Sequence, residues 1–292
     1  MYELSIKYIR CVRCGKKLDL EILKKDKEIE EGFLFCTNCD LHFPIVNKIP
    51  ILWNDFTNYL LNRPRLGGEL YTKATAAKLK LYIKTKLGSI EKNHHDMSLV
   101  EKRWSSIYDV NKKSPFYSLI HKLVNKISNS GIVLEHGCSI GNMTRHMAKS
   151  NDLVFGIDKS YHAISIAKQS NIENLDYFVA DSLLQPFGQM KFDTIIGLNL
   201  FELIEPKLLL KLLSKQTIKN GFLVISDPYD FDRGLNSVKE PLYEDSIRNE
   251  LIKLGFRVYK ETKKPKFLAW NLKLHNRATL RYKVDLVIGQ KQ

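Results

Sequence analysis

Five short apolar segments alternate with helical stretches between residues 131 and 226, and this alternation constrains the fold more than any other feature. The expected strands are residues 132–135, 154–158, 176–181, 192–198 and 221–226. Helical patterns lie between some of them, at 143–148, 163–169 and 206–214. Strands that alternate with helices predict a parallel sheet with helices on both faces. We therefore expect an α/β fold built on a doubly wound sheet.

The segments that flank this core have different patterns. Residues 55–130 are basic and mostly helical by their apolar spacing. Two stripes recur at that spacing, namely Leu79, Ile83 and Leu87, and Leu119, Leu123 and Ile127. After the core, residues 256–259 and 282–288 predict a terminal antiparallel pair. We expect Trp270 and His275 in the loop between these two strands.

Four of the five cysteines form two close pairs near the N-terminus, Cys11-x2-Cys14 and Cys36-x2-Cys39. A two-residue spacing lets one tight turn present both thiolates to a single ion, and two such turns complete a tetrahedral site. Zinc suits this donor set because it binds four thiolates without redox chemistry. A closed site leaves no position for a substrate, so we expect a structural zinc ion. His42 lies close behind the second pair and is expected at the surface.

A glycine-containing loop, EHGCSIG at residues 135–141, follows the first expected strand of the core. Gly137 and Gly141 allow a sharp turn and a close approach to a ligand. Asp158 ends the next strand, where a carboxylate can accept both hydroxyls of a ribose. Dinucleotide-binding loops place a helix N-terminus on a pyrophosphate, which the anion Glu135 would repel. Glu135 suits a cofactor that carries a sulfonium and an amino group, so the charge favours S-adenosylmethionine (SAM).

From about residue 104 to the C-terminus, the chain resembles the class I SAM-dependent methyltransferases, which have a Rossmann-like sheet. The loop matches their acidic, glycine-rich pattern at Glu135, Gly137 and Gly141, with Ser139 in place of the middle glycine. The loop cysteine, Cys138, is expected to be a small packing residue rather than a nucleophile.

The same resemblance implies cofactor contacts beyond the loop. It implies that Asp158 holds the ribose, that Lys159 lies beside the adenine, and that Asp181 and Ser182 contact the adenine edge. It also implies that Asn199 lines the methionine end. Two aromatic residues upstream, Trp104 and Tyr108, have two open interpretations, because they can either cover the cofactor or pack in the core.

The first 53 residues resemble the zinc ribbons of small methyltransferase activators and of ribbons fused to methyltransferases. The paired cysteines and the segment FPIVNKIPIL at 43–52 carry this resemblance. It implies a stabilising or substrate-presenting role. We therefore expect a zinc ribbon at 1–54, a helical basic connector at 55–103 and a methyltransferase domain at 104–292.

The methyl acceptor is expected at the carboxyl ends of the fourth and fifth core strands. Asp227 offers a carboxylate there, Tyr229 and Phe231 offer aromatic walls, and Pro228 stiffens the loop. We expect Asp227 and Tyr229 to be catalytic. The segments NLFELI and SDPYDF are similar to those of methyltransferases that act on imidazole nitrogen, which implies a small-molecule or peptide acceptor.

Two other functions remain open at this point. One is an rRNA or tRNA base methyltransferase whose ribbon recognises the substrate, which the net charge of +14 would suit. The charge excess is mostly lysine scattered through every segment, which is equally typical of a compositional bias. The other is a SAM-binding adaptor without activity. No apolar run approaches the roughly 20 residues that span a bilayer, and no signal segment begins the chain, so we expect a cytoplasmic protein. The sequence predicts no oligomeric state.

Overall fold

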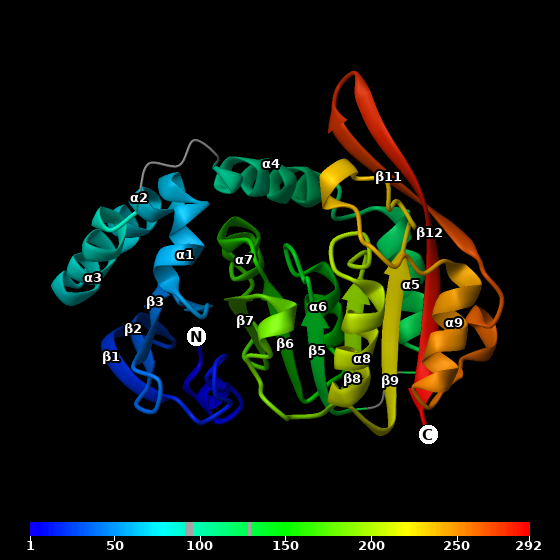
Figure 1. Cartoon of the computed structure of the whole chain (residues 1–292), viewed down its shortest axis with the longest axis horizontal. Helices are drawn as coiled ribbons and strands as arrows, with labels where there is room; N and C mark the ends of the chain where they lie inside the picture. The colour runs from blue at the N-terminus through cyan, green and yellow to red at the C-terminus, as the bar shows by residue number, and fades with distance from the viewer. Residues whose placement is uncertain (91–95, 128–129) are drawn as a thin grey trace. The chain divides into compact units, whose positions relative to one another are not determined.

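The computed structural model describes residues 1–90, 96–127 and 130–292, and the chain divides into two compact units (Figure 1). The first unit comprises Met1–Ser106, Ser139–Gly141 and Ile157–Met190. The second unit comprises Ile107–Cys138, Asn142–Gly156 and Lys191–Gln292. Strand β6 (Leu153–Asp158) begins in the second unit and ends in the first, so each unit is described separately.

An antiparallel meander opens the first unit, after the short 3-10 helix η1 (Glu3–Lys7). Its strands pair in chain order and are β1 (Asp19–Lys25), β2 (Ile29–Cys36), β3 (Leu41–Val46) and β4 (Ile49–Leu52). β4 then pairs in parallel with β7 (Leu175–Ala180), with Ile51 opposite Val179. Every residue of β4 is buried, as expected for a strand with a neighbour on each side. The β structure expected around the cysteine pairs is confirmed.

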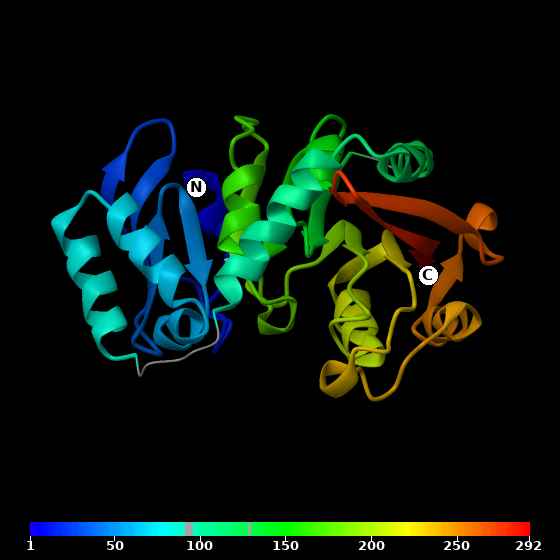
Figure 2. The same cartoon turned by 90° about the horizontal axis from the view of Figure 1, so that it is seen from above.

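Helices complete the first unit. They are α1 (Phe56–Leu61), α2 (Pro64–Lys73), α3 (Ala77–Gly88), the start of α4 (Met97–Val110), α7 (Tyr161–Ala167) and the 3-10 turn η2 (Ser182–Leu184). Figure 2 shows α1, α2 and α3 grouped together in cyan. Asp55 caps α1 by accepting the N–H of Thr57 at 2.8 Å. Leu79 and Ile83 of α3 are fully buried, which confirms the helical stripe at these positions.

The second unit is built on three parallel strands. β5 (Ile132–His136) pairs with β8 (Phe192–Leu198), and β8 pairs with β9 (Thr217–Asp227). The last strand, β12 (Ala278–Lys291), is antiparallel to β9 and also pairs with β10 (Phe256–Val258) and β11 (Phe267–His275). The helices of this unit are α5 (Pro115–Val124), α6 (Asn142–Met147), α8 (Pro206–Gln216) and α9 (Glu244–Lys253), with the 3-10 turns η3 (Gly234–Asn236) and η4 (Lys260–Thr262). This arrangement confirms the α/β fold with a Rossmann-like sheet and the terminal antiparallel pair.

One sequence-based expectation in the second unit is wrong. The segment 267–275 is not a loop but strand β11, which continues with β12 beyond the end of β9 as a hairpin (Figure 1). Its Trp270 is 5% exposed and stacks near Tyr108, with ring centroids 6.1 Å apart. The buried face of α5 is formed by Phe116, Ile120 and Val124, whereas Leu119 is 42% exposed.

Among the described residues, none of the helices combines the length and the apolar composition that crossing a membrane requires.

Candidate active site

The loop after β5 has the backbone geometry that its glycines predict. Gly137 and Gly141 have φ angles of +62° and +76°, in the left-handed region that favours glycine. A side chain at Gly137 would lie 2.5 Å from a methyl carbon of Leu200, and one at Gly141 would collide with the hydroxyl of Tyr177. Ser139 also has a positive φ, +48°, so this serine adopts the conformation for which the family pattern has glycine.

Asp158 ends β6 and holds the loop through backbone contacts. Its carboxylate accepts the N–H of Ser139 at 2.9 Å and the N–H of Ser160 at 2.8 Å. Burial raises the pKa of Asp158, and these two N–H groups, together with the charges of Lys159 and Arg63, oppose that rise. The structure therefore brings Asp158 and Ser139 together.

The residues expected near the adenine lie close together in the first unit. The ammonium of Lys159 is 3.0 Å from a carboxylate oxygen of Asp181, which also accepts the N–H of Leu183 at 2.9 Å. Ser182 begins the turn η2 and is 6% exposed. Lys159 and Asp181 thus neutralise each other at the ends of β6 and β7.

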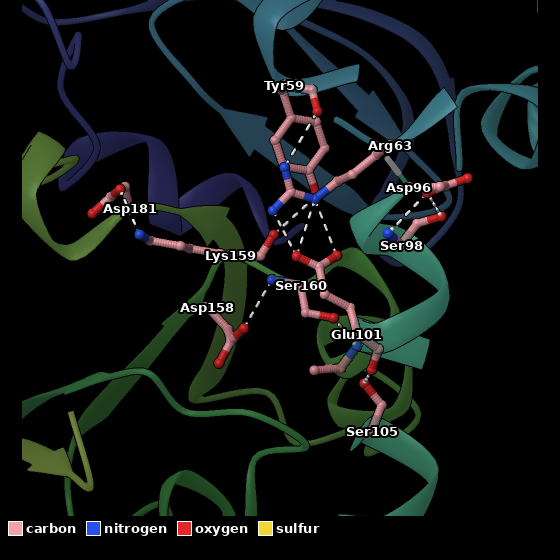
Figure 3. Close-up of polar contacts among 11 residues, drawn as sticks. Tyr59, Arg63, Asp96, Ser98, Glu101, Ser105, Asp158, Lys159, Ser160 and Asp181 are labelled. Carbon is pink, nitrogen blue, oxygen red and sulfur yellow. Dashed lines mark hydrogen bonds and ion pairs between the residues drawn. The ribbon is translucent and has the colours of Figure 1, made fainter. Parts of the chain in front are cut away.

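A buried ionic cluster that the sequence did not predict faces Asp158. Arg63 and Glu101 form an ion pair at 2.6 Å, and the Tyr59 hydroxyl donates to the Lys159 carbonyl at 3.0 Å (Figure 3). The pairing of Arg63 with Glu101 spans 38 residues, so no local pattern points to it.

In the second unit, the candidate residues lie at the ends of β5 and β8. Glu135 is 3% exposed near the end of β5. Asn199 follows β8 with a φ of +56°, and its side-chain oxygen accepts the hydroxyl of Ser226 at 2.8 Å. The Asn199 N–H donates to the Ser226 carbonyl at 2.7 Å. These contacts fix the turn after β8 against β9.

Asp227 at the end of β9 is a carboxyl group that can take up a proton near neutrality. It is 1% exposed and accepts the N–H of Phe201 at 3.0 Å and that of Tyr229 at 2.8 Å. Burial, helped by the nearby charge of Glu202, raises the pKa of Asp227 to about 7, and backbone N–H groups oppose this rise. A carboxyl group with this pKa can serve as a general base at neutral pH.

Tyr229 has a supporting contact that the sequence did not predict. Its hydroxyl donates to Asp285 at 2.8 Å, and Arg248 binds both oxygens of the same carboxylate, at 2.7 and 3.1 Å. Burial, with the Asp285 charge, raises the pKa of Tyr229. The hydroxyl is thus engaged, while the ring of Tyr229 lies 6.4 Å from that of Phe267, which is 46% exposed.

The four paired cysteines converge on one point. Their sulfur atoms all lie within 4.8 Å of one another, and no imidazole or carboxylate shares the cluster among the described residues. Burial raises the pKa of Cys11 to about 12, whereas the Lys16 N–H lowers the pKa of Cys14 to about 7. A buried thiol of this kind gives up its proton when a cation is present, so the cluster fits a metal ion that takes four thiolates. His42 is exposed, as expected.

Other singled-out residues have packing positions. Cys138 is 3% exposed, as expected for a small packing residue. The Tyr108 ring is nearly parallel to that of Trp270, at an interplanar angle of 6°, which favours the packing interpretation for Tyr108. Trp104 lies on α4 and is partly exposed.

The parallel order β5-β8-β9, the antiparallel strand β12 and the loop after β5 together define a class I methyltransferase core. Residues 133–217 match the sequence profile of a family described as "Methyltransferase domain". The chain therefore carries a methyltransferase domain and is an enzyme. No curated protein matches this chain in sequence.

Solved structures of similar fold have low sequence identity. One chain of the complex between the Haloferax volcanii Trm112 methyltransferase activator and the putative methyltransferase is 14% identical, with a TM-score of 0.51. The alignment covers 64% of this chain and 93% of that one. Magnesium protoporphyrin IX methyltransferase from Synechocystis PCC 6803 is 16% identical with a TM-score of 0.49, over 65% of this chain and 93% of that one. The first of these similarities supports the fold.

Proposed function

We propose that this enzyme transfers the methyl group of SAM to a nitrogen of an imidazole-like small molecule or peptide side chain. The observation that carries the proposal is the buried carboxyl group of Asp227, whose pKa is raised to about 7 at the end of β9. Methyl transfer from a sulfonium needs an aligned nucleophile, and a protonated nitrogen must also lose its proton. A base with a pKa near the working pH meets that need.

In this proposal, residues of each unit have donor-binding roles. In the first unit, Asp158 accepts the ribose hydroxyls, Ser139 and Gly141 give backbone access to the donor, and Lys159, Asp181 and Ser182 border the adenine. In the second unit, Glu135 and Gly137 face the charged methionine part, and Asn199 lines the same part. Two features support these roles: the left-handed φ angles of the loop and the backbone hydrogen bond from Ser139 to Asp158.

Asp227 and Tyr229 act on the acceptor in this proposal. Asp227 takes the proton, and the ring of Tyr229 forms an aromatic wall for a flat heterocycle. Tyr243, which is 51% exposed, and Phe231 lie within 6.3 Å of the Tyr229 ring, measured between ring centroids. Flat aromatic surfaces of this kind stack on heterocycles.

The acceptor is tested with SAM that carries a labelled methyl group. The enzyme is incubated separately with free histidine, a histidine-containing dipeptide and total RNA, and the label in each acceptor is counted. Label on histidine or the dipeptide, lost in Asp227→Asn, is expected. Label on RNA alone would contradict the acceptor class and favour the base methyltransferase, whereas SAM binding without transfer to any acceptor would favour the adaptor.

We also propose that Cys11, Cys14, Cys36 and Cys39 hold a structural zinc ion. The single cluster of four sulfur atoms supports this role. Elemental analysis of the purified protein should find one zinc ion per chain. Cys36→Ser should lose the ion and unfold at a lower temperature, because zinc binding and folding are coupled in four-cysteine sites. Cys138→Ser is the matched control and should keep its zinc, and zinc retained by Cys36→Ser would overturn the assignment.

A further inference from the structure

Arg63 is a buried cation between α1 and α2. It is 4% exposed, although arginine is almost never buried unless it is paired. Its guanidinium lies 4.4 Å from the centre of the Tyr59 ring and 5.9 Å from that of Trp53. Cation–π contacts of this kind fix the plane and the position of the charge.

Glu101 of α4 holds the same guanidinium from the other side. The Nε of Arg63 donates to both carboxylate oxygens, at 3.1 and 3.0 Å, and Nη2 donates to one of them at 2.6 Å. Nη1 donates to the Tyr59 carbonyl at 3.3 Å. A buried pair of this kind adds little net stability, because desolvation offsets the attraction. Its position therefore calls for a role other than stabilising the fold.

The pair is connected to the turn that carries Asp158. The Tyr59 hydroxyl donates to the carbonyl of Lys159, the residue next to Asp158. Figure 3 shows Tyr59, Arg63 and Glu101 gathered near the turn of Asp158, Lys159 and Ser160. Burial raises the pKa of Asp158, and the charge of Arg63 is one of the influences that lower it. Conversely, the charge of Asp158 contributes to raising the pKa of Glu101.

We propose that Arg63 is a positioning residue for donor binding, which acts through Asp158. Its fixed positive charge keeps the Asp158 carboxylate ionised, and Tyr59 holds the turn so that both oxygens stay available to a ribose. Glu101 holds Arg63 in place through hydrogen bonds, and its negative charge reduces the effect of Arg63 on Asp158. This inference rests on the proposed role of Asp158 in binding the ribose. It gives the segment 55–106 a part in cofactor binding beyond that of a connector.

Charged and titratable groups face Asp158 from several elements of the first unit. They are Lys159 on its own turn, Arg63 and Tyr59 from the α1–α2 region and Glu101 from α4. Asp181 pairs with Lys159, and the charge of Asp96 acts on Glu101. Because Arg63 precedes α2 and Glu101 lies in α4, each charge can be removed separately.

The experiment measures the affinity of 5′-deoxy-5′-methylthioadenosine from pH 4.5 to 8 by calorimetry. This nucleoside carries the ribose but no amino acid, so its own titration does not obscure that of Asp158. Arg63→Met should weaken binding by up to about tenfold at pH values below the midpoint, because loss of a nearby positive charge raises the pKa of a carboxyl group by about one unit. The pH at which half the affinity is lost should move upward. Arg63→Lys keeps the charge and should restore the wild-type midpoint.

Glu101→Gln gives the opposite expectation. It removes an anion near Asp158 but keeps an oxygen that accepts from Arg63, so the midpoint should move downward. If the role of the pair is purely structural, Arg63→Met and Glu101→Gln should both weaken binding, and the midpoint pH should not move in opposite directions. Arg65→Met is the matched control, because Arg65 is 69% exposed and loses the same charge, so it should leave the midpoint unchanged. If Arg63→Met fails to fold, the downward shift in Glu101→Gln carries the test.

The outcomes separate this inference from the proposed function. Unchanged binding of the nucleoside by Asp158→Ala would overturn the role of Asp158 itself. Lost binding in Asp158→Ala, together with a wild-type midpoint in Arg63→Met, would leave Asp158 as the ribose ligand and overturn the role of Arg63. Shifts in the same direction in Arg63→Met and Glu101→Gln would also overturn it.

Discussion

Two aspartates end strands in the two units, and their backbone contacts are alike. Asp158 ends β6 and Asp227 ends β9, and each accepts two backbone N–H groups. In each case, one donor is the N–H two residues further along the chain, at 2.8 Å. Local backbone structure therefore gives these two carboxyl groups the same support.

Their charged neighbours differ in sign. Arg63 and Lys159 act on Asp158 and oppose the effect of burial on its pKa, whereas Glu202 acts on Asp227 and adds to that effect. The same local structure can thus hold a ligand-binding carboxylate at one strand end and a proton acceptor at another. The long-range neighbours decide between these roles.

The largest expected effect comes from removing the proton acceptor that we propose, Asp227. Asp227→Asn cannot take a proton, so kcat should fall by about 10²–10⁴-fold, the usual contribution of a general base. The SAM dissociation constant should stay within a few-fold of the wild-type value. Steady-state kinetics and calorimetry measure the two quantities. Asp230→Asn is the matched control on the same loop, since Asp230 is 47% exposed. Loss of SAM affinity in Asp227→Asn would remove the distinction between the two aspartates.

Asp227→Asn also tests the raised pKa of Asp227, through the pH dependence of the free energy of unfolding. The folded protein holds Asp227 with a pKa of about 7, above the ordinary value of 3.8. It therefore keeps a proton that the unfolded chain releases, so the contribution of Asp227 to the free energy of unfolding decreases as the pH rises from about 4 to 7. Asp227→Asn should flatten this slope in denaturant titrations. An unchanged slope would contradict the raised pKa.

Asp285 is a buried aspartate of the second unit that has a cation as its partner. Asp285 is fully buried and forms two hydrogen bonds with Arg248, so Asp285→Asn leaves a buried cation without its partner. The free energy of unfolding should fall by about 3–5 kcal/mol in denaturant titrations. Glu250→Gln breaks an exposed pair with Lys253 and should change it by about 1 kcal/mol or less. Equal losses in the two variants would argue against burial as the cause.

A smaller effect is expected from the anion beside Asp227. Glu202→Gln removes a charge that raises the pKa of Asp227. The acidic limb of the kcat/KM profile should move to lower pH, by about one unit or less. Glu205→Gln is the control, because Glu205 accepts N–H groups of Lys239 and Glu240 instead. A shift to higher pH in Glu202→Gln would contradict the charge argument.

The smallest effect is expected from the hydroxyl of Tyr229. Tyr229→Phe removes one hydrogen bond to Asp285 and should lower the free energy of unfolding by about 1–2 kcal/mol. Since the ring remains, kcat should fall less than tenfold, whereas Tyr229→Ala should reduce it further. Stability and kcat are measured on the same preparations. A large loss of kcat in Tyr229→Phe alone would assign the proton transfer to the hydroxyl instead.

Local patterns in the sequence predicted the parts of the fold that local chemistry determines. Gly137 and Gly141 predicted the loop, because only a left-handed backbone needs glycine there, and the cysteine spacing predicted the four-sulfur cluster. The sequence of strand β11 has the alternation that predicts a half-buried strand, since Leu268, Trp270 and Leu272 alternate with exposed residues. The two strands predicted at 256–259 and 282–288 placed this segment in the connection between them.

The environments of the two aspartates were not predictable in this way. Arg63 meets Glu101 across 38 residues, and Asp227 accepts from Phe201 across 26 residues. Both contacts depend on how helices and strands pack, and no spacing along the chain encodes them. The sequence therefore predicted which carboxyl groups stand at the strand ends, but not which charge each one faces.

Calorimetric titration of SAM into the wild-type protein and into Asp158→Ala tests the central claim most directly. We expect the wild type to bind one SAM per chain, and Asp158→Ala to bind about a hundredfold more weakly, because two hydrogen bonds to a charged acceptor are lost. Equal affinity in the two proteins, or no binding by the wild type, would contradict the assignment of the donor site.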